Sequence, residues 1–168
     1  FEYADYAFKQ SIELIDKYKP SVFWNDIGWP YAGENQIPHL LSHYYNTVDG
    51  AVTNDRWNDL YYGFKTKEYQ NGDVDNEEKW EMCRGLGLSF GYNEAESEER
   101  VISVAGLVNL LVSTVANNGN LLINVGPKAN GEIPERQVER LLGLGSWMKV
   151  NGEAIYGTTL SSHKNVKL

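Results

Sequence analysis

The chain has little of three features that would point to a specific class of function: cysteine, clustered positive charge and long apolar runs. Its one cysteine, Cys83, excludes an internal disulfide and any zinc site built from several cysteines. Lys and Arg number 15 against 23 Asp and Glu, so the formal net charge is −8, and no basic cluster is long enough to follow a phosphate backbone. The sequence therefore argues against nucleic acid or an anionic membrane as a partner.

Targeting and membrane-spanning patterns are also missing. No run approaches the roughly 18 apolar residues of a membrane span, and no signal peptide opens the chain. The first residue is Phe1 and not Met, so we expect a processed or partial chain. The length of 168 residues, with 42% apolar and 12% aromatic residues, is typical of one folded domain.

What the sequence does contain is an alternation of helical and strand patterns. Four segments carry apolar residues at helical spacing and are followed or preceded by Pro, Gly or Asn-Gly: 3–18, 38–48, 103–117 and 134–150. Five short apolar or β-branched segments are predicted to be strands: 21–25, 51–54, 64–68, 86–90 and 120–125. We expect the first strand to be buried. In the last helix we expect four side chains to face inward: Val138, Leu141, Leu142 and Met148.

The predicted order, α-β-α-β-β-β-α-β-α, favours an α/β fold with a parallel sheet covered by helices. In such sheets the active residues lie just beyond the carboxyl ends of the strands. A complete (β/α)8 barrel takes about 250 residues, whereas only about five parallel strands can be placed here. We therefore expect a partial or reduced TIM-like barrel, with residues 1–168 forming a single catalytic fragment. Its open edges would be closed by another chain or a second copy.

Two motifs suggest other chemistries, but neither matches its pattern fully. Residues 85–91 resemble a dinucleotide-binding loop, but the third glycine is one position late and no acidic ribose partner follows. His39 and His43 stand four apart on a helix and could chelate zinc, yet position 40 is Leu and not the Glu of a metalloprotease helix. A pair of ordinary surface histidines is the simpler interpretation. The sequence predicts no metal and no cofactor.

Paired carboxylates remain the best catalytic candidates. Asp26 directly follows the strand pattern at 21–25 and is flanked by Trp24 and Trp29. Aromatic faces pack on the apolar faces of sugar rings, and a carboxylate can address the anomeric carbon, so this arrangement suits a carbohydrate site. The structural alternative is that Asp26 begins a loop as an Asx-turn residue.

A second carboxylate and a cation complete the candidate site. Glu68 ends a later strand, although four other acids compete for that place: Glu34, Glu77, Glu78 and Glu81. Arg56, after another strand, could hold a sugar hydroxyl or orient a carboxylate through its planar guanidinium. The structural alternative for Arg56 is a surface ion pair with Asp55 or Asp59.

At these residues the sequence resembles a known family, the α-L-fucosidases of glycoside hydrolase family 29. The resemblance follows the chain in order through these segments: 14–29, 54–57, 65–69, 80–81 with 85–93, 120–127 and 143–147. It covers about residues 10–157, and matches in a constant order are far more specific than any single motif.

The resemblance implies a retaining exo-glycosidase that hydrolyses terminal α-L-fucosides through a covalent fucosyl-enzyme. Asp26 would be the ionised nucleophile. Glu68 would be the acid/base, which the charge of Asp26 keeps protonated for the first step. Trp24, Arg56 and Phe90 match positions that line the fucose pocket. No metal or cofactor is needed.

The chain departs from the family pattern in what surrounds this pair. Family members carry an N-terminal half-barrel that supplies histidines and a C-terminal β-sandwich domain, and neither matches here. The histidines present, His39, His43 and His163, do not sit in the family's histidine motifs. We expect a homo-oligomer that completes the barrel around a fucosylated glycan or small fucoside. The alternatives are one half of a split glycosidase, or a non-catalytic fucose-binding or scaffolding remnant.

Overall fold

The computed structural model describes residues 2–57, 61–70 and 78–160, and the chain forms two compact units. We call residues 1–66 the N-terminal unit and residues 67–168 the C-terminal unit. Asp59, Glu77, His163 and most of the acidic loop at 71–78 lie outside the described residues.

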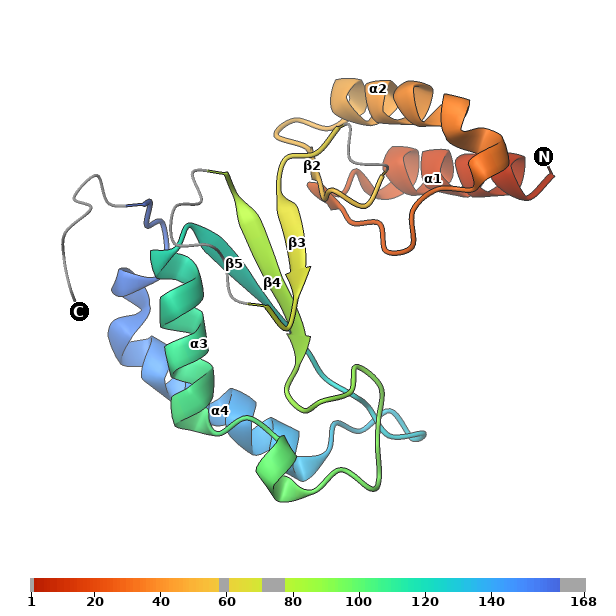
Figure 1. Cartoon of the computed structure of the whole chain (residues 1–168). Helices are drawn as coiled ribbons and strands as arrows, with labels where there is room; N and C mark the ends of the chain where they lie inside the picture. The colour runs from red at the N-terminus through yellow and green to blue at the C-terminus, as the bar shows by residue number, and fades with distance from the viewer. Residues whose placement is uncertain (1, 58–60, 71–77, 161–168) are drawn as a thin grey trace. The chain divides into compact units, whose positions relative to one another are not determined.

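Over the described residues the order of helices and strands is the predicted one, with three short 3-10 helices (η) added (Figure 1). In chain order the elements are α1 (Glu2–Tyr18), β1 (Val22–Phe23), η1 (Tyr31–Gln36), α2 (Ile37–Thr47), β2 (Val52–Thr53), β3 (Lys65–Glu68), β4 (Trp80–Gly85), η2 (Glu98–Arg100), α3 (Val104–Ala116), β5 (Gly119–Asn124), α4 (Glu135–Asn151) and η3 (Gly152–Ala154).

The strand pairings whose direction is defined are parallel. β1 pairs with β2 with Val22 opposite Val52, and Asn54, just after β2, forms a parallel bridge with Phe64. A second sheet has the order β3-β4-β5, in which β4 and β5 run parallel. The α/β class is therefore confirmed. Parallel strands bring their carboxyl ends to one edge, and in such folds the loops at that edge carry the functional side chains.

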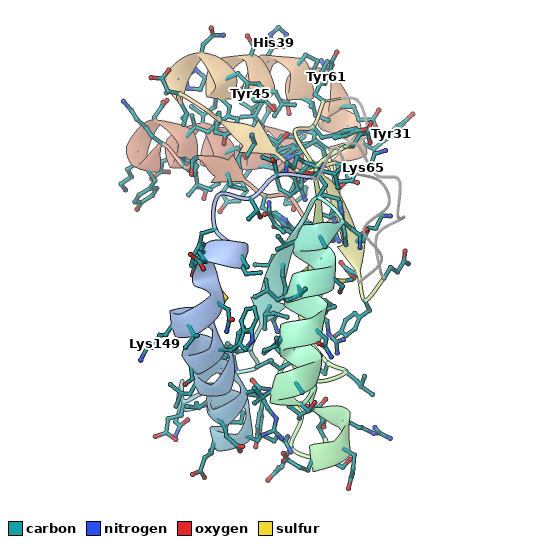
Figure 2. The ribbon with its side chains drawn as sticks, turned by 90° about the vertical axis from the view of Figure 1, so that its left-hand side faces the viewer. Tyr31, His39, Tyr45, Tyr61, Lys65 and Lys149 are labelled. Atoms are coloured by element: carbon teal, nitrogen blue, oxygen red, sulfur yellow. The ribbon has the colours of Figure 1, made fainter. Side chains whose placement is uncertain are left out.

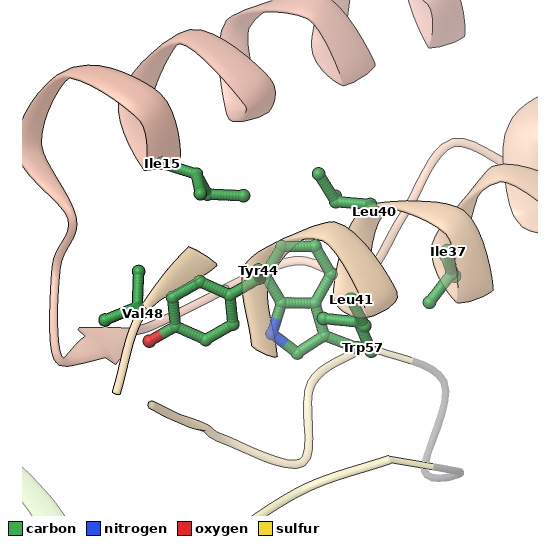
Figure 3. Close-up of a cluster of buried hydrophobic side chains, with 7 residues drawn as sticks. All are labelled: Ile15, Ile37, Leu40, Leu41, Tyr44, Val48 and Trp57. Atoms are coloured by element: carbon green, nitrogen blue, oxygen red, sulfur yellow. The ribbon is translucent and has the colours of Figure 1, made fainter. Parts of the chain in front are cut away.

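The N-terminal unit is built around an aromatic and aliphatic core between its two helices. Figure 3 shows Ile15 of α1 facing Leu40 of α2, with Tyr44 and Trp57 beneath them. The core contains seven buried side chains: Ile15, Ile37, Leu40, Leu41, Tyr44, Val48 and Trp57. Phe23 of β1 joins this core through its ring contacts with Tyr44 and Trp57, at 5.4 and 5.0 Å between centroids. A two-residue strand is thus anchored mainly by its aromatic side chain.

The C-terminal unit packs two helices on its sheet. Helices α3 and α4 run side by side in both ribbon views (Figures 1 and 2), and Lys149 points outward from α4. The core joins Leu86, Val101 and Leu107 to half-buried residues of β5 and α4. The first turn of α3 is capped by Ser103, whose hydroxyl oxygen accepts the Gly106 N–H at 3.1 Å.

The strand predicted at 86–90 is wrong, because the strand occupies Trp80–Gly85 and the chain turns immediately after it. The turn is tight: a Cβ on Gly85 would lie 2.6 Å from the Ser89 carbonyl oxygen. Leu86 is fully buried in the core just beyond the strand, where its N–H donates to the Asn124 carbonyl. Of the apolar residues at 86–90 only Leu86 packs in the core, whereas Leu88 and Phe90 are exposed, and Glu81 and Arg84 interrupt the apolar pattern of β4.

Three burial predictions are also wrong. Val138 and Leu142 of α4 are exposed, because the face of α4 that packs on the unit's core carries Leu141 and Leu144. On β1, Val22 is 47% exposed, and only Phe23 turns toward the core.

One segment departs from the expectation that no run suits a membrane span. Residues 98–116 are long and apolar enough to cross a membrane, by length and composition alone. A helix that covers a sheet has the same composition, and here Leu107 and Thr114 of α3 are buried in the C-terminal unit. The α-helical part, 13 residues, is about 20 Å long at 1.5 Å per residue.

Candidate active site

Asp26 lies in a bend three residues after the end of β1. The bend is closed by Asn25, whose side-chain amide donates to the Gly28 carbonyl at 3.0 Å, and Gly28 has the positive φ of +81° that the bend needs. The Asp26 side chain is 69% exposed. A carboxylate presented in this way at a strand end is accessible to a ligand.

The loops after β1 and β2 are joined by two asparagines. Asn54 is fully buried; its Oδ1 accepts the Asn25 N–H at 2.9 Å, and its Nδ2 donates to the Asn25 carbonyl at 2.6 Å. The Asn25 side chain also donates to the Arg56 carbonyl at 2.9 Å. These bonds fix the backbone on both sides of Asp26 and Arg56. No sequence pattern singles out Asn54, although it stands in the Asn-Asp-Arg-Trp segment of the resemblance.

Arg56 brings Asp26 and Trp24 together. Its Nη1 lies 2.6 Å from Asp26 Oδ1, its Cζ lies 4.8 Å from the centre of the Trp24 ring, and its Nε donates to Thr66 Oγ1 at 3.0 Å. Arg56 therefore makes an ion pair with Asp26, and Asp59, the other acid of the structural alternative, lies outside the described residues. Asp55, one of the two acids in the structural alternative, instead accepts from Thr66.

The second flanking tryptophan has a different place. The Trp29 ring packs against Trp57 at 5.6 Å between centroids, and its Nε1 donates to the Gly33 carbonyl at 2.9 Å. Trp29 thus belongs to the wall of the core, and of the two tryptophans Trp24 is the one that meets the charged groups.

In the C-terminal unit, the end of β3 lies close to Phe90. Glu68 is exposed, and the next residue, Tyr69, has a positive φ of +52°. The Tyr69 ring meets Phe90 edge-on at 5.4 Å, while its hydroxyl donates to the Gly87 carbonyl and accepts the Gly85 N–H. The turn after β4 is thereby attached to the residue that follows Glu68.

A buried carboxylate that sequence analysis missed holds the same turn. Glu96 is 6% exposed, and its Oε1 accepts the Leu88 N–H at 2.8 Å. A Cβ on Gly87 would lie 2.2 Å from both Glu96 carboxylate oxygens, so a larger residue there would displace the Glu96 carboxylate. Arg136 of α4 donates a hydrogen bond from Nη1 to the Glu96 carbonyl at 2.5 Å. Glu96 stands among Glu94, Glu98 and Glu99, so the sequence does not distinguish it from solvated acidic residues.

The predicted catalytic acids are carried by different units, Asp26 by the N-terminal unit and Glu68 by the C-terminal unit. Their convergence on one sugar stays a prediction. Among the competing acids, Glu34 lies in η1 and Glu81 within β4.

The histidine pair on α2 has separate environments. His43 Nε2 lies 2.6 Å from Asp16 Oδ1, and His39 is exposed on the outer side of α2 (Figure 2). Within the described residues, no group of three or more His, Cys, Asp or Glu side chains is placed to hold a metal ion.

Comparison with known proteins identifies the family of the chain. The family model described as α-L-fucosidase matches residues 1–153. The chain is 36% identical over 160 residues to an α-L-fucosidase of Dictyostelium discoideum, covering 90% of this chain and 35% of that protein. It is 35% identical over 159 residues to the human tissue α-L-fucosidase, with coverage of 87% and 34%.

Solved structures give the same result. The Thermotoga maritima α-fucosidase in complex with fucose superposes with a TM-score of 0.89 at 49% identity, over 97% of this chain and 37% of that one. The chain therefore spans about a third of the length of the relatives that it matches.

Proposed function

The chain belongs to the α-L-fucosidase family, and we propose that it hydrolyses terminal α-L-fucosides with retention of anomeric configuration. The observation that carries this proposal is the arrangement of Asp26 and Arg56 over Trp24 at the carboxyl ends of two parallel strands, where such folds hold their catalytic groups. The relative from Thermotoga maritima that is solved with fucose supports this sugar as the ligand.

In the proposed mechanism Asp26 is the nucleophile. Its exposed carboxylate attacks the anomeric carbon, and the glycosidic bond breaks as a covalent fucosyl-enzyme forms. Glu68 gives its proton to the departing oxygen and afterwards takes a proton from the water that releases fucose. A retaining pair needs carboxyl groups about 5–5.5 Å apart, and this is the separation we predict with fucose bound.

Arg56 and the aromatic side chains would shape the sugar pocket. With no sugar present, Arg56 compensates the charge of the exposed Asp26 carboxylate at 2.6 Å. The Trp24 ring holds the guanidinium from one face, and Phe90, packed against Tyr69, offers a second apolar surface. We propose that these three side chains contact fucose.

We further propose that the chain is a reduced (β/α)8-type barrel of five parallel strands within one catalytic domain, completed by copies of itself. Strand residues that a closed barrel would cover are exposed: Val22 of β1 by 47% and Leu122 of β5 by 42%. Neighbouring subunits that cover these side chains would also supply the remaining wall of the pocket.

The test combines solution mass with activity in one chromatographic fraction. We expect an oligomer that releases nitrophenol from nitrophenyl α-L-fucoside and gives α-fucose as the first product by proton NMR. Asp26→Gly should remove this activity, and azide should restore part of it as a fucosyl azide of inverted configuration. Asp49→Asn, at an exposed acid outside the site, is the matched control.

Two outcomes would contradict the proposal. A stable monomer that binds fucose without turnover would favour the binding remnant. Activity that appears only after a different polypeptide is added would favour one half of a split glycosidase.

A further inference from the structure

Arg56 is held in place by a residue that the proposed mechanism does not use. Its Nε donates to Thr66 Oγ1 at 3.0 Å. The Thr66 hydroxyl in turn donates its proton to Asp55 Oδ1 at 2.7 Å, and the same carboxylate oxygen accepts the Thr66 N–H at 2.9 Å. One hydroxyl therefore accepts from the guanidinium and donates to the carboxylate.

The direction of these bonds follows from the chemistry of the groups. A guanidinium can only donate, and Asp55 as a carboxylate can only accept, so the hydroxyl proton of Thr66 must point to Asp55. A hydroxyl lone pair is then left facing Arg56 Nε. The bond from the Thr66 N–H keeps Asp55 in this position, because it ties the carboxylate to the backbone of β3.

When the Nε and the face of a planar guanidinium are both held, the position of its Nη1 atom is largely fixed as well. Thr66 fixes Nε, and the Trp24 ring lies 4.8 Å from Cζ, so the direction of Nη1 toward Asp26 Oδ1 is determined. The Arg56 side chain is 20% exposed, whereas the Asp26 side chain is 69% exposed. The arginine is the more buried and more fully bonded partner, so it sets the orientation of the exposed carboxylate.

We infer that Thr66 and Asp55 are positioning residues that orient the Asp26 carboxylate through Arg56. The inference rests on the proposed function, because it assigns Asp26 the role of nucleophile. Thr66 also stands two residues before Glu68 in the same strand, so side-chain alternation puts both on one face of β3. A single strand would thus carry the acid/base and the hydroxyl that orders the nucleophile.

The test compares Thr66→Val, which keeps the shape but removes the hydroxyl, with Thr66→Ser, which keeps the hydroxyl. The first readout needs no turnover: hydrogen exchange of the Arg56 Nε–H by NMR, identified by its loss in Arg56→Lys. We expect protection in the wild type and in Thr66→Ser, and at least about tenfold faster exchange in Thr66→Val, since the proton has lost its acceptor.

The second readout is kinetic. Loss of a hydrogen bond to a charged group predicts a fall of about tenfold to a hundredfold in kcat/KM for Thr66→Val. The fall should be as large for a dinitrophenyl fucoside, which needs no acid catalysis, as for a nitrophenyl fucoside. Thr66→Ser should restore most of it. A loss confined to the less activated substrate would place Thr66 with the acid and overturn the inference.

The inference would also be overturned if Thr66→Val left the Nε–H exchange rate unchanged. Equal exchange rates and equal kcat/KM values in Thr66→Val and Thr66→Ser would overturn it too. If the wild type shows no hydrolysis, the proposed function fails while the exchange measurement still decides whether Thr66 holds Arg56.

Discussion

The two units hold the ends of their strands in different ways. In the N-terminal unit the ladder between β1 and β2 has only two residues on each strand, and the side-chain amides of Asn54 and Asn25 join the loops that follow it. In the C-terminal unit β4 and β5 pair over six residues, and the buried Glu96 fixes only the turn beyond them. Function in the N-terminal unit therefore depends more on individual polar side chains.

The sharpest test of this comparison sets the two proposed catalytic acids against each other. Asp26→Gly should lower kcat by at least roughly 10³-fold with any leaving group, because the attacking atom is gone. Glu68→Ala should lower it by about 10²–10⁴-fold with a poor leaving group but far less with dinitrophenolate, which departs without a proton. Steady-state kinetics on both substrates measure the difference. Equal sensitivity of the two variants to the leaving group would contradict the assigned roles.

The next largest effect should come from Leu→Ala substitutions in the two cores, which should lower the free energy of unfolding by different amounts. Leu40→Ala lies among rigid aromatic rings that cannot close the cavity, so we expect a loss of about 4 kcal/mol in the free energy of unfolding. Leu107 packs in a cluster of three buried side chains bordered by half-buried ones that can relax, so we expect a loss of about 2–3 kcal/mol for Leu107→Ala. Urea denaturation followed by circular dichroism checks both. Leu142→Ala, at a side chain 67% exposed, is the control and should change little. A larger effect at Leu107 would reverse the comparison.

Asn54→Ala should show how much the amide link matters. It leaves the Asn25 N–H and carbonyl without their partners, and we expect a loss of about 2–3 kcal/mol in stability. Activity should fall in addition, since Asp26 and Arg56 lose their common support. Asn120→Ala, at an exposed position of β5, is the matched control in the C-terminal unit. Equal stability of both variants in urea would mean that the link is dispensable.

The smallest expected effect is a loss of stability of the N-terminal unit at alkaline pH. Burial raises the pKa of the Tyr44 phenol above its usual 10.0, and its hydroxyl donates to the Pro20 and Val52 carbonyls. The folded chain keeps this proton more tightly than the unfolded chain, so the contribution is full below pH 10 and is lost as pH rises through the raised pKa.

Tyr44→Phe should therefore be less stable than wild type by about 1 kcal/mol at pH 7, and the gap should narrow above pH 10. Urea titrations at pH 7 and above pH 10 measure this difference in stability, with Tyr18→Phe as an exposed control. A gap that does not change with pH would contradict the account of Tyr44.

Much of the fold of the two units could be predicted from the sequence. Helical periodicity located all four α-helices, and the apolar segments located four of the five strands, because both patterns record burial of one face. The strand at 80–85 was missed since Glu81 and Arg84 interrupt its apolar character. Exposure of Val22 and Leu142 was missed since an apolar residue at a strand or helix position predicts burial whether or not a partner element is present.

The candidate site shows the same limits. Asp26, Arg56 and Trp24 could be named because each follows or ends a strand pattern, and the structure brings these three together. Asn54, Thr66 and Glu96 could not be named, because their roles depend on hydrogen bonds to backbone and side chains distant in sequence. Polar residues that support a site leave no periodic signal.

Covalent trapping tests the central claim most directly. A 2-deoxy-2-fluorofucosyl fluoride has a good leaving group, and its fluorine slows hydrolysis of the covalent intermediate, so the labelled enzyme accumulates. Peptide mass spectrometry of the treated chain should find one fluorofucosyl group, attached to Asp26. A label on any other residue, or no label after prolonged incubation, would contradict the claim that Asp26 is the nucleophile of a retaining fucosidase.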